Sequence, residues 1–138
     1  MISFEGPKVV LGISVSALST ELKSLDIIGE VLPEGEVNDF TSKGDTCSFK
    51  VKGGVSIHLE KDLENLTEGM ILRLNTVAPS PVKFSLEVIA ADHSQGSTCY
   101  VRSDADLNPF TRMMVEPALN SLFKKMAEGM VNRFPTSP

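Results

Sequence analysis

Three oxygen-bearing residues in the last third of the chain have the spacing of a calcium-binding loop. Asp104, Asp106 and Asn108 follow the pattern D-x-D-x-N, in which carboxylate and amide oxygens bind Ca²⁺ in EF-hand loops. That loop also requires a glycine next and a glutamate at its twelfth position, and Pro109 and Val115 stand there instead. The match therefore fails. Asp104 and Asp106 are expected on the outer side of a strand, and Asn108 as the cap of a helix.

The two histidines are the obvious candidates for acid–base chemistry. His93 falls in a turn, and His58 shares the polar side of an alternating segment with Glu60. General acid–base catalysis needs titratable groups held in a cleft that separates their pKa values. Neither histidine is expected in such a cleft, so catalysis by His58 is not favoured.

The two cysteines have no partners in the sequence that would suggest a metal site or a nucleophile. Cys47 and Cys99 are far apart and outside any CxxC or Cys/His group, whereas zinc is held by grouped ligands. A nucleophilic thiol would need a nearby base. Both are expected to be reduced thiols packed in the core, and no metal or cofactor is predicted.

The charge balance narrows the possible partners. Thirteen basic and 18 acidic residues give a net charge of −5, and the absence of a basic stripe argues against nucleic-acid binding. No apolar run approaches the roughly 18 residues of a membrane span, and no signal peptide is visible, so a cytoplasmic location is expected. The stretch 26–39 contains no basic residue and is a possible surface for a protein partner. Its acidic residues are Asp26, Glu30, Glu34, Glu36 and Asp39.

The elements that position these residues are predicted from periodicity. With 138 residues, the chain is expected to form a single domain over 1–138. Gly53-Gly54 separates two alternating segments as a hairpin turn would, and further turn signals recur at short intervals. The pattern predicts an antiparallel sheet of seven strands, at about 2–11, 36–41, 47–52, 55–60, 70–77, 82–91 and 97–107.

Three helices complete the prediction. Apolar residues at helical spacing begin at Val15, with Ser14 or Ser16 as the N-cap, and a second short helix over 25–32 is stopped by Pro33. The last helix begins at Asn108-Pro109 and runs to about Phe134. Its predicted apolar stripe consists of Val115, Ala118, Leu119, Leu122, Phe123, Met126 and Met130.

The apolar side of each strand is expected to face inward, where Ser103 would be one of the few polar groups. The side chains on the other, outward side of each strand form a set that is expected to face water. It takes nearly every titratable side chain of the sheet, namely Lys50, His58, Glu60, Arg73, Glu87, Tyr100, Arg102, Asp104 and Asp106.

The order strand, two short helices, further antiparallel strands and long C-terminal amphipathic helix resembles the START-like, or helix-grip, superfamily, which includes polyketide cyclases and lipid-transfer domains. More narrowly, Val31-Leu32-Pro33-Glu34 and Asn108-Pro109-Phe110 are similar to small single-domain bacterial members. The resemblance covers essentially the whole chain. It implies an α+β fold whose curved sheet wraps around the long helix and leaves an apolar cavity.

We therefore expect a non-enzymatic carrier or sensor that binds a small apolar, lipid-like or aliphatic ligand between the sheet and the last helix. Two alternatives remain: a protein-interaction module that uses the acidic stretch 26–39, and a cyclase- or dehydratase-like enzyme. The enzyme would need His58, Glu60, Arg102 or Asp104 inside the cavity. The predicted ligand-binding residues are Phe49, Ile57, Leu72, Phe84, Val101, Leu119, Leu122, Phe123, Met126 and Met130.

Overall fold

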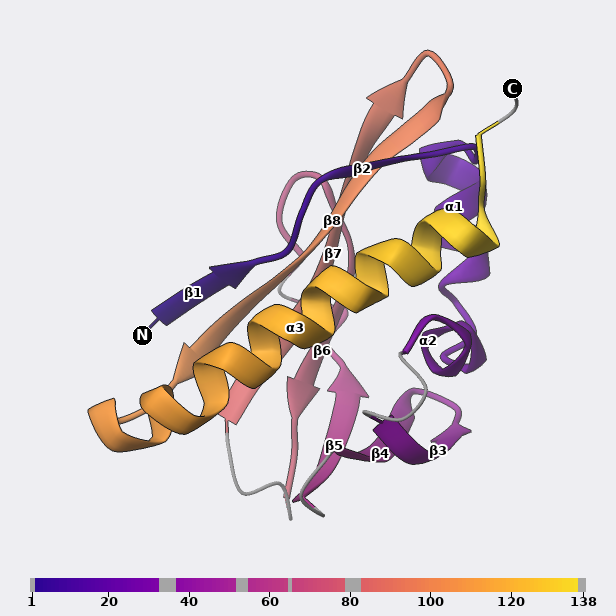
Figure 1. Ribbon diagram of the computed structural model, residues 1–138. Helices are drawn as coiled ribbons and strands as arrows, with labels where there is room; N and C mark the ends of the chain where they lie inside the picture. The colour runs from indigo at the N-terminus through magenta and orange to yellow at the C-terminus, as the bar shows by residue number, and fades with distance from the viewer. Residues whose placement is uncertain (1, 33–36, 52–54, 65, 79–82, 137–138) are drawn as a thin grey trace.

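The computed structural model describes residues 2–32, 37–51, 55–64, 66–78 and 83–136, and Figure 1 shows one curved antiparallel sheet with a long helix across its face. The sheet order is β1-β8-β7-β6-β5-β4-β3, and β2 also pairs with β8. This is the predicted helix-grip form of the α+β class. The strands are β1 (Ile2–Glu5), β2 (Val9–Leu11), β3 (Val37–Lys43), β4 (Thr46–Val51), β5 (Val55–Lys61), β6 (Met70–Thr76), β7 (Lys83–His93) and β8 (Gly96–Asp106).

The first predicted strand is divided into β1 and β2, so the sheet has eight strands rather than seven. Pro7 stands at the break and has no backbone N–H to donate to a ladder. Gly6 precedes it, donates its N–H to the Val101 carbonyl at 2.8 Å and lies against Phe123 of the long helix. A Cβ at Gly6 would lie 3.0 Å from the Phe123 Cβ. The break thus brings the backbone close to the helix.

Strand β3 is irregular at the edge of the sheet. Its register with β4 shifts between Asn38 and Thr41, and Asp39 between them has a positive φ of 54°. A bulge of this kind bends an edge strand. The predicted Gly53-Gly54 turn between β4 and β5 lies outside the described residues.

Two short helices, α1 (Val15–Glu21) and α2 (Asp26–Val31), follow β2. The Ser14 hydroxyl accepts a hydrogen bond from the Ala17 N–H at 3.1 Å, which confirms Ser14 as the N-cap of α1. The Ser24 hydroxyl accepts the Asp26 N–H at 3.3 Å at the start of α2. Pro33 and the acidic Glu34 and Glu36 lie outside the described residues.

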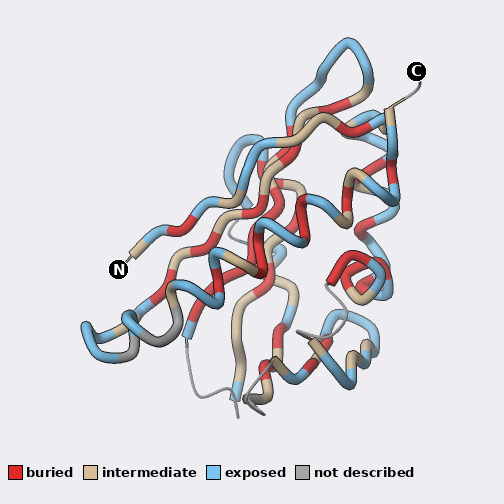
Figure 2. Tube along the Cα trace, in the orientation of Figure 1, coloured by how far each residue is buried: buried red, intermediate tan, exposed pale blue. Residues whose placement is uncertain are grey.

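The last helix, α3 (Pro109–Arg133), runs along the concave side of the sheet, nearest β8, β2, β1 and α2. Buried residues gather between α3 and the sheet, whereas the end of the β7–β8 hairpin is exposed (Figure 2). The predicted stripe is confirmed from Leu119 onward, but Ala118 is exposed, and the side chain of Val115 lies outside the described part. Phe110 and Met113, at the start of the helix, are 75% and 78% exposed. None of the described helices is both long and apolar enough to cross a bilayer.

Candidate functional site

The ten residues predicted to bind a ligand all belong to one hydrophobic core. Five come from β4, β5, β6, β7 and β8, and five from α3. Each is buried, with between 0 and 6% of its surface exposed. The structure therefore brings the predicted residues together between sheet and helix, where their side chains are closed off from solvent.

Other elements also contribute to this interior. Leu18 in the middle of α1, Leu22 just after its end and Ile28 of α2 are buried in the same core. These residues were predicted to form helices but were not predicted to border the site. Their helical spacing showed an apolar face, but only the packed chain shows that this face joins the sheet–α3 interior.

Two serines are buried in the interior and lack hydrogen-bond partners within the described part of the chain. Strand β8 alternates strictly between buried and partly exposed residues from Ser97 to Ala105, so Ser97 and Ser103 both lie on the buried side. Neither Oγ has a partner among the described residues. An unsatisfied buried hydroxyl costs about 1–3 kcal/mol, which makes each position unusual in an otherwise apolar layer.

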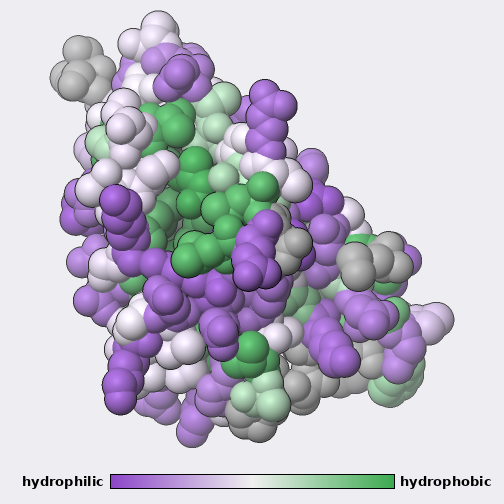
Figure 3. Space-filling view, turned by 180° about the vertical axis from the view of Figure 1, so that it is seen from behind, coloured by the Kyte–Doolittle hydropathy of each residue, from purple (hydrophilic) through white to green (hydrophobic). Residues whose placement is uncertain are grey.

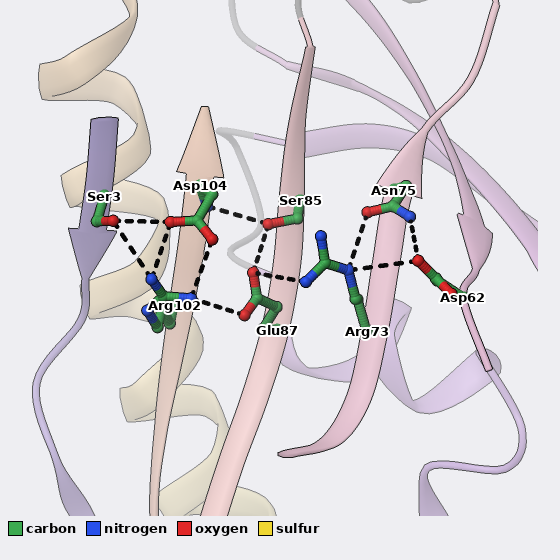
Figure 4. A network of polar contacts seen from close by, with 8 residues as sticks. All are labelled: Ser3, Asp62, Arg73, Asn75, Ser85, Glu87, Arg102 and Asp104. Atoms are coloured by element: carbon green, nitrogen blue, oxygen red, sulfur yellow. Dashed lines mark hydrogen bonds and ion pairs between the residues drawn. The ribbon is translucent and has the colours of Figure 1, made fainter. Parts of the chain in front are cut away.

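The opposite face of the sheet carries a network of polar and charged side chains that runs from β1 across β8, β7 and β6 to Asp62, just after β5 (Figure 4). At its centre, Glu87 is fully buried. Its carboxylate accepts a hydrogen bond from Arg102 Nη1 at 2.9 Å and one from the Ser85 hydroxyl at 2.5 Å. Arg73 Nη1 lies 3.7 Å from the same carboxylate. Two arginines thus neutralise one buried acid.

Both arginines also have a second carboxylate. Arg102 pairs with Asp104 at 2.9 Å, and Arg73 lies 3.5 Å from Asp62. The five side chains alternate between negative and positive charge, and each lies beside a neighbour of opposite sign. The network is therefore a set of ion pairs that joins neighbouring strands.

The outward side chains were predicted to face water, and for Glu87 this prediction is wrong. Its direction is as predicted, but side chains from both neighbouring strands, Arg73 and Arg102, cover it. The alternation of polar residues indicates a face of the sheet, and it does not show what covers that face.

Asp104 is part of this network rather than of a calcium loop. Its carboxylate accepts a hydrogen bond from the Ser3 hydroxyl at 2.7 Å, and this bond, together with Arg102, lowers the pKa of Asp104. Within the described part of the chain, no group of three or more acidic, histidine or cysteine side chains is placed to hold a metal ion.

The enzyme alternative required an ionisable group inside the interior. Arg102 and Asp104 lie on the outer face, and Glu60 is exposed. His58 is opposite Ser48 in the β4–β5 register, on the side away from the buried Ile57 and Leu59. None of the four predicted residues is therefore in the space between sheet and α3.

His58 instead lines an open groove of about 510 Å³ at the β3–β5 end of the sheet. Four of its ten lining residues carry a hydroxyl group, and the sequence did not predict this groove. Its lining consists of Thr41, Ser42, Lys43, Thr46, Cys47, Ser48, His58, Leu59, Val77 and Ala78.

Both cysteines are free and buried, as predicted. Burial raises the pKa of Cys47 to about 11 and that of Cys99 to about 12. Nucleophilic thiols have a lowered pKa, so neither side chain is activated.

The described acids of the stretch 26–39 have partners within the chain. Asp26 accepts a hydrogen bond from the Ser42 hydroxyl, Glu30 pairs with Arg133 at 3.3 Å, and Asp39 lies 3.8 Å from Lys50. A protein partner at this surface stays a prediction.

Hydrophobic side chains also reach the surface on the side of the molecule away from α3. Seen from behind, they line a hollow in the upper half, with a band of hydrophilic side chains below it (Figure 3). The connection between β5 and β6 carries two exposed leucines, Leu63 and Leu66.

Comparison with known proteins identifies the fold and no family. No family model and no curated protein matches the sequence. Among solved structures, the protein XoxI from Bacillus cereus has a TM-score of 0.68 at 12% identity, covering 97% of this chain and 96% of that one. DR_A0006 from Deinococcus radiodurans has a TM-score of 0.60 at 12% identity, covering 96% of this chain and 95% of that one. MLL2253 from Mesorhizobium loti has a TM-score of 0.60 at 15% identity, covering 96% of this chain and 98% of that one. At such identities the likeness establishes a shared architecture over nearly the whole chain, and no activity follows from it.

Proposed function

We propose that this protein binds a small, largely apolar ligand between the sheet and α3, and that it acts as a carrier or sensor rather than through catalysis. The observation that supports this most strongly is the composition of the interior. Its walls come from the sheet, α1, α2 and α3, and the ten predicted residues are all hydrophobic. Burial of apolar ligand surface, worth roughly 25 cal/mol per Å², would supply the affinity.

A ligand would enter this interior by displacing side chains, because they close it off from solvent in the conformation described. Met126 and Met130 on the buried face of α3 suit this role, since unbranched thioether side chains adapt to irregular and changing surfaces.

Thermal unfolding with a panel of long-chain alcohols, fatty acids, sterols and small aromatics tests the proposal. A ligand that binds only the folded protein stabilises it by about 2.7 kcal/mol at a hundred times its Kd. We expect aliphatic members of the panel to raise the unfolding temperature. Uniformly absent shifts would contradict the proposal.

A pair of methionine variants on α3 locates the site. Met126→Ala opens space in the buried interior and should change the affinity for the best ligand several-fold. Met113→Ala removes an exposed side chain of the same type from the same helix and should leave that affinity unchanged. Equal effects of the two variants would place the ligand elsewhere.

A further inference from the structure

We infer that the interior ligand is a neutral amphiphile, such as an alcohol, ketone or ester, whose single polar group hydrogen-bonds to Ser103. The inference rests on the proposed function. It adds a polar anchor, the Ser103 hydroxyl, and a charge class for the ligand, which should be neutral.

Ser103 lies within the proposed binding wall. It follows Val101, one of the predicted ligand-binding residues, by two positions on the buried side of β8. On one side it pairs with the buried Phe4 of β1, and on the other β8 runs beside β7, where Phe84 of the wall pairs with Ala105. The hydroxyl is therefore surrounded by apolar side chains.

The Ser103 hydroxyl is fully buried and has no partner among the described residues. A hydroxyl can donate one hydrogen bond and accept two. Ser85 of β7, by contrast, is a buried serine whose hydroxyl is satisfied: it donates to Glu87 at 2.5 Å and accepts the Asp104 N–H at 3.0 Å. The unsatisfied Ser103 Oγ is thus available to a polar group that arrives with a ligand.

The charge of that polar group follows from what surrounds it. The buried polar and charged residues of the described chain are Ser85, Glu87, Ser97 and Ser103, so this set contains no buried lysine, arginine or histidine. The one charge, on Glu87, lies on the opposite face of the sheet and is already paired. An ionised carboxylate in the interior would have no counter-ion, and an unpaired buried charge is strongly unfavourable. A neutral group that needs one hydrogen bond fits.

Ser97 provides a matched control. Its hydroxyl is also buried, unpartnered and on the same side of β8. Six residues of strand place it about 20 Å from Ser103, beside Leu11 of β2 and Asp92 of β7. It is not adjacent in register to any predicted ligand-binding residue.

The test uses three cyclohexyl compounds of matched shape: cyclohexane, cyclohexanol and cyclohexanecarboxylate. Their Kd values are measured at pH 7 by chemical-shift titration of the ¹⁵N-labelled protein and of three variants, Ser103→Ala, Ser103→Cys and Ser97→Ala. The cysteine variant keeps the shape of the side chain, with a slightly larger sulfur atom, but has only a weak hydrogen-bonding group. Both Ser103 variants should weaken cyclohexanol binding roughly 2- to 10-fold, the effect of one hydrogen bond, and leave cyclohexane unchanged. Ser97→Ala should change neither, and the carboxylate should bind the unsubstituted protein at least roughly tenfold more weakly than the alcohol.

The outcomes separate this inference from the proposed function. If cyclohexane and cyclohexanol both bind but the Ser103 variants affect them equally, the apolar site stands and the anchor is wrong. An equal effect of Ser97→Ala on cyclohexanol also overturns the anchor. If the carboxylate binds as tightly as the alcohol, the inference that the ligand is neutral is wrong. If none of the three binds, both the proposed function and the inference fail.

Discussion

Glu87 is the residue on which the outer face of the sheet depends most directly. Its carboxylate has no exposed surface and interacts with two arginines and a serine. Removing one partner of a buried ion pair typically costs about 3–5 kcal/mol, because the remaining charges lose their compensation.

We therefore expect Glu87→Ala to lower the free energy of unfolding by about 3–5 kcal/mol in urea titrations, and Glu87→Gln to lower it less. Glu116→Ala is the control, since it removes an acid from an exposed pair on α3, 3.1 Å from Arg112. Its cost should be at most about 0.5 kcal/mol. Similar losses for both alanine variants would mean that the buried network contributes little.

Asp104 gives the network a pH dependence whose sign can be stated. The hydrogen bond from Ser3 and the pairing with Arg102 lower its pKa in the folded protein. The ionised form is therefore favoured by folding. The stabilisation is present above the ordinary aspartate value of about 3.9 and is lost as the pH falls through the lower folded value.

Asp104→Asn should consequently destabilise the protein more at pH 7 than at pH 3, as measured by urea unfolding at both values. Ser3→Ala should act in the same direction, because its hydroxyl makes the largest contribution to the shift. A stability difference that does not narrow at low pH would contradict this assignment.

At the scale of elements, the close approach of α2 and α3 depends on Gly129. A Cβ at this position would lie 2.6 Å from the Val31 carbonyl oxygen, closer than van der Waals contact allows. Alanine is a better helix former than glycine by about 1 kcal/mol. Helix propensity therefore predicts that Gly129→Ala raises the free energy of unfolding, whereas packing predicts that it lowers it.

We expect packing to dominate, and Gly129→Ala to lower the free energy of unfolding by about 1–3 kcal/mol as overpacked substitutions do. Glu128→Ala, at the exposed neighbouring position, should change stability by no more than about 0.5 kcal/mol. A stabilising effect of Gly129→Ala would show that α2 can move away from α3 at little cost.

At the scale of the whole molecule, the segment that follows β2 is joined to the end of α3. The Gly12 N–H donates to the Phe134 carbonyl at 2.9 Å, just beyond the end of α3, and the Phe134 side chain is buried in the core. Figure 1 shows the same arrangement, with β2 beside the C-terminal end of α3. This contact fixes the helix against the sheet.

Phe134→Ala should therefore lower the free energy of unfolding by about 3–5 kcal/mol, as truncation of a buried phenylalanine does. Asn132→Ala removes an exposed side chain two residues earlier and is expected to be close to neutral. Guanidinium titrations of both variants measure the difference. A small loss for Phe134→Ala would mean that the end of α3 is not required to hold the helix.

Much of the architecture follows from local pattern. The alternation along β8 predicted which residues are buried, because successive side chains of a strand point to opposite faces whatever the strand pairs with. The N-cap at Ser14 and the start of α3 at Asn108-Pro109 are likewise local effects of capping and of proline geometry. The ten predicted ligand-binding residues come together for the same reason: each is on the apolar side of its own element.

Only the tertiary structure decided what those faces meet. The burial of Glu87 depends on arginines of β6 and β8, and no spacing around Glu87 itself predicts them. The contact of Gly6 with Phe123 at the break between β1 and β2 joins residues far apart in the chain. Ser103 was predicted to point inward, but whether its hydroxyl has a partner depends on which groups surround it after folding. Periodicity is a property of one element, whereas burial of charge and satisfaction of hydrogen bonds depend on several elements at once.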